Sequence, residues 1–236
     1  MKPEAAIKTI GIIGGSTEFA TIEYYRQINA AVNRHLGGYY TGEIIIDSMN
    51  FAQSAYFVNN GLWEEGGAYL QKKAKRLEQS GAAFILCVSN TWHRAAPYFM
   101  REVSIPLLHI VDPTAAEIKA AQVRTVALLG TLPVMSTPFL IDEFVRQDIE
   151  IVVPEPADQT YINQVIFDEM SKGVFSDEAR ARYLDIVDGL HERGAEGVIL
   201  GCTEIPLLIN QHHRPSLPMF DTLKLHAEAA AKLALA

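Results

Sequence analysis

Two similar segments of the chain end in side chains that could exchange protons. Residues 81–91 (GAAFILCVSNT) return as residues 194–204 (GAEGVILGCTE), and this alignment matches Ser89 with Cys202. A thiol can act as an acid, base or nucleophile, whereas a hydroxyl is a weaker acid that serves as a proton donor or relay. If a pseudo-twofold axis relates the segments, the two side chains would approach one cleft from opposite sides. That arrangement would suit chemistry on both faces of a single carbon atom.

A second pair of segments supports an internal duplication. Residues 7–14 (IKTIGIIG) return as residues 123–130 (VRTVALLG). The first copy runs into a glycine turn before a predicted helix, so backbone N–H groups near Gly15 and Ser16 could hold a carboxylate at the positive helix end. The alternative is a tight turn that simply needs glycine. Neither the G-x-G-x-x-G spacing nor a phosphate-loop lysine is present, so we predict no nucleotide site.

The position of Cys202 favours a chemical role. It follows an apolar segment and precedes a predicted helix starting near residue 205, where the helix dipole would lower the pKa of a thiol from about 8.5. The opposing interpretation, an inert core cysteine, fits Cys87 better because its repeat partner is Leu200. Cys87 would share a face with Ser89, roughly 6.6 Å deeper in the strand. It remains the alternative thiol.

The surrounding pattern is typical of βαβ units on a parallel sheet. Predicted strands span residues 9–13, 43–47, 84–88, 107–109, 125–129, 150–152, 198–200 and 218–220. Predicted helices span residues 17–36, 63–80, 92–101, 114–121, 134–147, 159–172, 177–193, 205–208 and 222–235. The predicted fold class is α/β, with two pseudo-symmetric open α/β lobes whose mainly parallel sheets face each other across a cleft. The lobes would span residues 1–103 and 104–221, and the C-terminal helix, 222–236, can pack back on the first.

Composition limits the classes of function. The 236 residues are 49% apolar and carry a formal charge of −8, which argues against a nucleic-acid partner. No apolar segment approaches the roughly 18 residues of a membrane helix, and no signal peptide is recognisable, so we expect a cytoplasmic protein with no membrane partner. Two cysteines 115 positions apart are then expected to be free thiols. The adjacent His212 and His213 have no suitably spaced third ligand, and we predict no metal site.

Four motifs together resemble the aspartate/glutamate racemases. They are residues 201–206 (GCTEIP), Asn90-Thr91-x-His93, the glycine turn and residues 129–131 (LGT). The resemblance spans nearly the whole chain and implies a two-lobed α/β fold, a homodimer, and cofactor-independent chemistry in which paired cysteines remove and return an α-proton. The family usually has Cys-Asn-Thr where this chain has Ser89-Asn90-Thr91. The expected pair is therefore Cys202 as thiolate base or acid and Ser89 on the opposite face.

The resemblance also implies supporting roles. Asn90, Thr91 and Thr203 resemble ligands of the substrate carboxylate, and Asn50 and Thr131 further substrate contacts. Lys172 resembles a basic residue that binds a distal carboxylate. His93 and Glu204 are placed to orient or charge a neighbour. The ordinary alternatives are helix capping for Ser, Thr and Asn, and a dipole interaction for lysine.

The resemblance thus implies a cofactor-independent amino-acid racemase of the aspartate/glutamate type, acting on a small amino acid or carboxylate. Recognition of a distal carboxylate calls for a cation, and Lys172, Arg94 and Arg26 are the candidates. One alternative is a single-cysteine decarboxylase, resembling the arylmalonate decarboxylases, or a cis–trans isomerase. Another is a catalytically silent protein that binds carboxylates.

Overall fold

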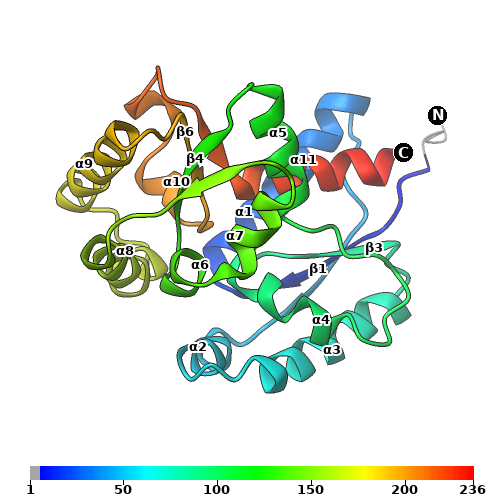
Figure 1. The fold of residues 1–236 in the computed structure, drawn as a ribbon. Helices are drawn as coiled ribbons and strands as arrows, with labels where there is room; N and C mark the ends of the chain where they lie inside the picture. Colours follow the sequence, from blue (N-terminus) through cyan, green and yellow to red (C-terminus); the bar gives the residue numbers. More distant parts are fainter. Residues whose placement is uncertain (1–5) are drawn as a thin grey trace. The chain divides into compact units, whose positions relative to one another are not determined.

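The computed structural model describes residues 6–236 and divides into two compact units (Figure 1). The first contains the chain up to Ile110 together with His226–Ala236, and the second is Val111–Leu225. Relative to the predicted lobe boundaries after residues 103 and 221, the units divide a few residues further along the chain. Each unit is built on a parallel sheet.

The sheet of the first unit has the strand order β2-β1-β3. Its strands are β1 (Ile10–Gly14), β2 (Ile44–Ser48) and β3 (Phe84–Cys87). Its helical elements are α1 (Glu18–Leu36), α2 (Phe51–Asn59), α3 (Trp63–Gln79), η1 (Thr91–Ala95), α4 (Ala96–Phe99) and the end of α11 (Thr222–Leu235). Figure 1 shows α3 and α4 on one side of this sheet and α1 and α11 on the other.

Helix α1 shows how local sequence sets the start and end of an element. Thr17 caps it by accepting a hydrogen bond from the Ala20 N–H at 3.1 Å, which satisfies one of the free donors of the first turn. At the other end Gly37 adopts a φ of +72°. Between these residues Tyr24 and Ile28, four residues apart, are fully buried, so a single stripe of the helix faces the core.

The sheet of the second unit has the order β5-β4-β6-β7. Its strands are β4 (Thr125–Leu129), β5 (Glu150–Val152), β6 (Gly197–Leu200) and β7 (Met219–Asp221). Its helical elements are α5 (Val111–Ala120), α6 (Leu132–Ser136), α7 (Pro138–Val145), α8 (Pro156–Asp168), η2 (Met170–Lys172), α9 (Asp177–Glu192), α10 (Ile205–Leu208) and η3 (Gln211–His213). In Figure 1, α8 and α9 lie on one side of β4 and β6, and α5 and α7 on the other.

The sequence repeat reappears as a shared strand register. Gly11 of β1 pairs with Ile85 of β3, and the matching residue of β4, Ala127, pairs with the matching residue of β6, Val198. The first strand of each unit has the next two strands on its two sides: β1 lies between β2 and β3, and β4 lies between β5 and β6. The two sheets therefore place residues 89 and 202 at equivalent positions beyond the strand ends.

One helix was missed, and several predicted elements differ from the structure. Helix α2 was missed, and the predicted strand 107–109 is a single bridge between Leu107 and Ile85. The predicted helix 92–101 is a 3₁₀ segment followed by one turn of α-helix, η1 and α4. The predicted helix 134–147 is divided at Thr137, which is extended at φ −125° and ψ 150° because Pro138 disfavours helical geometry in the preceding residue.

No helix within residues 6–236 is both long enough and apolar enough to cross a membrane.

Candidate active site

The Cys202 turn joins a thiol to a buried carboxylate. Gly201 separates Cys202 from β6, and a side chain at Gly201 would come within 2.7 Å of the Leu129 carbonyl oxygen. The Cys202 Sγ donates a hydrogen bond to Glu204 Oε2 at 3.1 Å, and the Thr203 hydroxyl donates to the same oxygen at 2.8 Å. All three side chains are buried. The thiol proton of Cys202 is therefore directed at the Glu204 carboxylate.

The protonation state of Cys202 differs from the prediction. Burial and the adjacent Glu204 carboxylate raise the pKa of Cys202 well above its usual range, and backbone hydrogen bonds at residues 203 and 204 oppose this only in part. The predicted lowering of this pKa by a helix dipole is wrong. Helix α10 has only four residues, so its dipole is small, whereas the carboxylate carries a full charge within hydrogen-bond distance. The resting side chain is a neutral thiol.

The Ser89 turn has the same place in its sheet but different partners. The Ser89 Oγ accepts a hydrogen bond from the Trp92 N–H at 3.4 Å, and the Ser89 carbonyl lies 2.7 Å from His93 Nδ1. Ser89, Asn90 and Thr91 are each less than 10% exposed. Three consecutive polar side chains are thus buried at the end of β3, which is unusual for a loop.

His93 is hydrogen-bonded to the backbone of the Ser89 turn. The Ile110 N–H donates to His93 Nε2 at 3.3 Å, so the ring proton is assigned to Nδ1, which donates to the Ser89 carbonyl. Burial, followed by the neighbouring His109 and His226, lowers the pKa of His93 well below its usual value. His93 is therefore neutral and acts on the backbone of residue 89 rather than as an acid.

Sequence reasoning missed the histidine cluster around His93. Its ring centroid lies 4.5 Å from that of His109 and 6.0 Å from that of His226. His226 bridges the Tyr24 hydroxyl at 2.8 Å and the Leu108 carbonyl at 2.9 Å. Within residues 6–236 no group of three or more His, Cys, Asp or Glu side chains could hold a metal ion. The hydrogen bonds of His93 and His226 tie the cluster to the Ser89 and Leu108 carbonyls.

Cys87 belongs to the core of the first unit. It has no exposed surface, whereas Cys202 keeps 9%. It pairs with Ile13 in the sheet, and burial raises the pKa of Cys87 to about 12. These contacts fit the core role that the sequence favoured for it.

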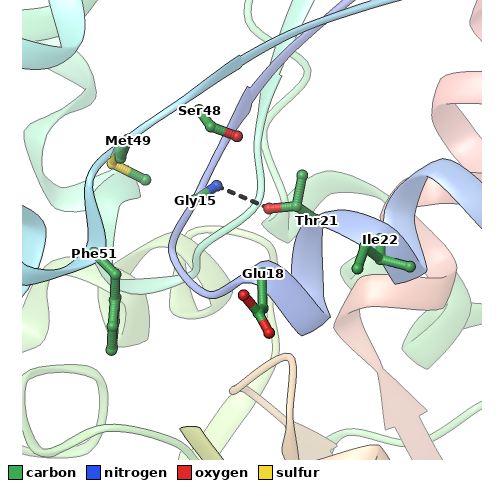
Figure 2. A pocket seen from close by; sticks show the side chains of 7 residues that line it. All are labelled: Gly15, Glu18, Thr21, Ile22, Ser48, Met49 and Phe51. Carbon is green, nitrogen blue, oxygen red and sulfur yellow. Dashed lines mark hydrogen bonds between the residues drawn. The ribbon is translucent and has the colours of Figure 1, made fainter. Parts of the chain in front are cut away.

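The glycine turn after β1 borders a pocket of about 400 Å³. Gly15 has a φ of +81°, and a Cβ there would lie 2.3 Å from the Met49 carbonyl oxygen, so only glycine fits. Its N–H, expected to face an anion, instead donates to the Thr21 hydroxyl at 2.8 Å. Figure 2 shows this bond and the residues that line the pocket: Gly15, Glu18, Thr21, Ile22, Ser48, Met49 and Phe51. Ser16, half-buried, is the next residue of the turn.

The remaining residues that were predicted to contact substrate lie at the ends of helices. Asn50 is exposed and caps α2 by accepting from the Gln53 N–H at 3.3 Å. Thr131 is buried at the start of α6. Lys172 is exposed, with its Nζ 4.0 Å from an Asp168 oxygen. The capping role of Asn50 is the ordinary alternative given above.

Each of the three side chains proposed to bind a distal carboxylate contacts a neighbouring side chain. Lys172 lies beside Asp168, as described. The Arg94 guanidinium lies 4.4 Å from the centre of a Trp63 ring. Arg26 forms two hydrogen bonds with the Glu23 carboxylate, at 2.6 and 2.8 Å.

Comparison with known protein families shows which family the chain belongs to. Residues 10–230 match the family described as Asp/Glu/Hydantoin racemase. The chain belongs to this family. Its members are isomerases by name, and the match includes both the Ser89 and the Cys202 turns.

Solved structures and a curated relative agree with this family. A protein of Yersinia pestis, provisionally named an Asp/Glu racemase, is 36% identical, with 98% of this chain and 100% of that chain covered and a TM-score of 0.90. An aspartate racemase homologue of Pyrococcus horikoshii OT3 is also 36% identical, over 97% and 99% of the chains, with a TM-score of 0.82. The broad specificity amino-acid racemase RacX of Bacillus subtilis (strain 168) is 24% identical over 163 residues, 69% of this chain and 70% of RacX.

Proposed function

We propose that the chain is a cofactor-independent amino-acid racemase whose acid/base groups are Cys202 and Ser89. Family membership supports the reaction class, and the name of RacX supports an amino acid as substrate. The observation that carries the choice of residues is the shared register of the two sheets, which gives residues 89 and 202 equivalent places beyond β3 and β6. The proposal requires these two side chains to act on opposite faces of one α-carbon.

Glu204 gives Cys202 a route to the thiolate. A neutral thiol cannot remove an α-proton, so the Sγ proton first passes to the Glu204 carboxylate, to which it is already hydrogen-bonded. The thiolate then takes the α-proton, and the electron pair of the C–H bond moves into the substrate carboxylate as an enediolate. Thr91, Asn90 and Thr203 are the proposed donors that hold this carboxylate. Donors aimed at developing charge are commonly the largest single source of catalysis.

Ser89 completes the reaction on the other face. Its hydroxyl donates a proton to the enediolate carbon and regains one from solvent, while Glu204 releases to solvent the proton that it took from Cys202. In the reverse direction Ser89 must act as the base. Near neutral pH a serine hydroxyl loses its proton far less readily than a cysteine thiol. The two enantiomers are therefore expected to lose their α-hydrogen at different rates.

The test is NMR-monitored loss of the α-hydrogen in D2O over a panel of L- and D-amino acids, with chiral chromatography of the products. We expect exchange accompanied by appearance of the opposite enantiomer. Exchange without inversion would remove Ser89 from the reaction, and no exchange with any amino acid would overturn the proposal. Binding without exchange would select the carboxylate-binding alternative.

The neutral state of Cys202 supports a second candidate, a decarboxylase that needs only one proton donor. In such a reaction loss of CO2 creates the carbanion, and a thiol protonates it without first being ionised. Aryl- and alkylmalonates are the probes, with CO2 release as the readout. Release of CO2 from a malonate, together with no α-hydrogen exchange in amino acids, would place this candidate first.

A further inference from the structure

The pocket beside the glycine turn carries a negative charge. Glu18 is the one charged residue among those that line it. Within residues 6–236, the Glu18 carboxylate makes no hydrogen bond or ion pair with another side chain, and neither does the Ser48 hydroxyl. Two acceptor-bearing side chains therefore face the pocket without a partner from the described chain.

Two donors beside the pocket are bonded within the glycine turn. The Gly15 N–H donates to the Thr21 hydroxyl, and that hydroxyl donates to the Thr17 carbonyl at 2.9 Å. The start of α1 contributes about half a unit of positive charge, which only partly offsets the full charge of Glu18. An anion placed here would meet the negative charge of Glu18, whereas an ammonium group would donate a charge-assisted hydrogen bond to that carboxylate.

The other pocket walls also suit a cation. Figure 2 shows the Glu18 carboxylate and the Phe51 ring projecting in the same direction from the two sides of the Gly15 turn. An aromatic ring attracts an ammonium group through its π face. The lining thus combines a carboxylate, a hydroxyl and an aromatic ring.

We propose that this pocket is a subsite for an ammonium group of the substrate, with Glu18 as its counter-charge. The proposal rests on the proposed function, because an amino acid is what brings such a group. The ammonium can be the α-amino group, common to all amino acids, or the end of a basic side chain. In either case a distal carboxylate is disfavoured at this pocket.

Three matched ligands separate the two sources. L-lysine carries both ammonium groups, L-norleucine only the α-ammonium, and L-2-hydroxyhexanoate neither. Their dissociation constants are measured with the ¹⁵N-labelled full chain from the shifts of the Gly15 and Met49 backbone amides. If the α-ammonium is bound, Glu18→Gln weakens binding of lysine and norleucine by about tenfold and spares the hydroxy acid. If the side-chain ammonium is bound, only lysine is affected.

A matched control excludes general effects of charge on α1. Glu23 lies on the same helix, outside the pocket, and pairs with Arg26, so Glu23→Gln should leave all three dissociation constants unchanged. The inference is overturned if Glu18→Gln changes binding of both amines by less than about twofold, or if none of the ligands shifts the Gly15 amide of the wild-type protein. This readout needs no turnover, so α-hydrogen exchange in the same samples shows separately whether the proposed racemase activity fails.

Discussion

The Ser89 and Cys202 turns have the same position in their sheets and different chemistry. At residue 89 the side chain accepts a hydrogen bond from the Trp92 N–H, and the carbonyl is held by a neutral histidine. At residue 202 the side chain donates to a buried carboxylate. The two units therefore share a strand register but differ in chemistry at these equivalent positions, and of the two turns only the second combines a thiol with a neighbouring carboxylate.

The largest expected effect comes from removing the thiol of the second turn. Cys202→Ala should lower kcat for α-hydrogen exchange by at least about a thousandfold, because no other described group there can replace the acid/base. Cys87→Ala should keep most of the activity and lose about 1 to 2 kcal/mol of unfolding free energy, since it leaves a small core cavity. Exchange rates and urea unfolding check the pair, and an inactive Cys87→Ala with an active Cys202→Ala would reverse the assignment.

Removing the proton acceptor of the second turn should have the next largest effect. Glu204→Gln should lower kcat at pH 7 by about a hundredfold, because the thiol loses the group that takes its proton. It should also lower the pKa of Cys202, since the adjacent negative charge raises that pKa in the wild type.

Alkylation by iodoacetamide as a function of pH reports this shift directly. Cys202 of the Glu204→Gln variant should become reactive at a lower pH than in the wild type, with Cys87→Ala present in both proteins so that only one thiol is followed. A midpoint that stays in place or moves to higher pH would show that the carboxylate does not control the thiol.

Placing a thiol in the first turn, as in the second, should change the ratio of the α-hydrogen exchange rates of the two enantiomers. Ser89→Cys should raise the slower direction by about tenfold and leave the faster one within about threefold, because a thiol is the better acid and base. Ser89→Ala should suppress inversion while leaving some exchange on the Cys202 face. Initial rates of deuterium incorporation from each pure enantiomer provide the measurement, and an unchanged ratio in Ser89→Cys would separate residue 89 from the chemistry.

The smallest predicted effect concerns the histidine support of the first turn. Burial lowers the pKa of His226 from 6.5 to about 4. Its stabilising contribution is therefore complete above pH 6.5 and is lost as the pH falls toward 4, because the unfolded chain takes up a proton that the folded chain resists. The loss should reach about 2 kcal/mol at pH 5.

Urea unfolding at pH 7 and pH 5 tests this support. His226→Gln should reduce the difference in unfolding free energy between the two pH values, while the surface variant His35→Gln should not. Equal pH dependence in His226→Gln and the wild type would show that other groups carry the acid sensitivity.

The sequence predicted those features that depend on local pattern. The apolar strand segments and their repeat were enough to place β3 and β6, and Ser89 opposite Cys202 in the alignment. Helix α2 was missed although Asn50 was available as its cap, and Pro138 was not recognised as the break between α6 and α7.

Features that depend on tertiary environment could not be read from the sequence. The raised pKa of Cys202 depends on burial and on the direction of the Glu204 side chain. The histidine cluster brings together residues 93, 109 and 226, which are far apart in the chain. The negative character of the pocket became visible only once the Gly15 N–H was found to be satisfied by Thr21.

The most direct test of the unequal pair is the initial rate of α-hydrogen exchange of the wild-type protein with each enantiomer of the same amino acid in D2O. The account predicts that one enantiomer exchanges at least about tenfold faster than the other, because a thiol and a hydroxyl serve the two faces. Equal and fast exchange from both enantiomers would contradict it.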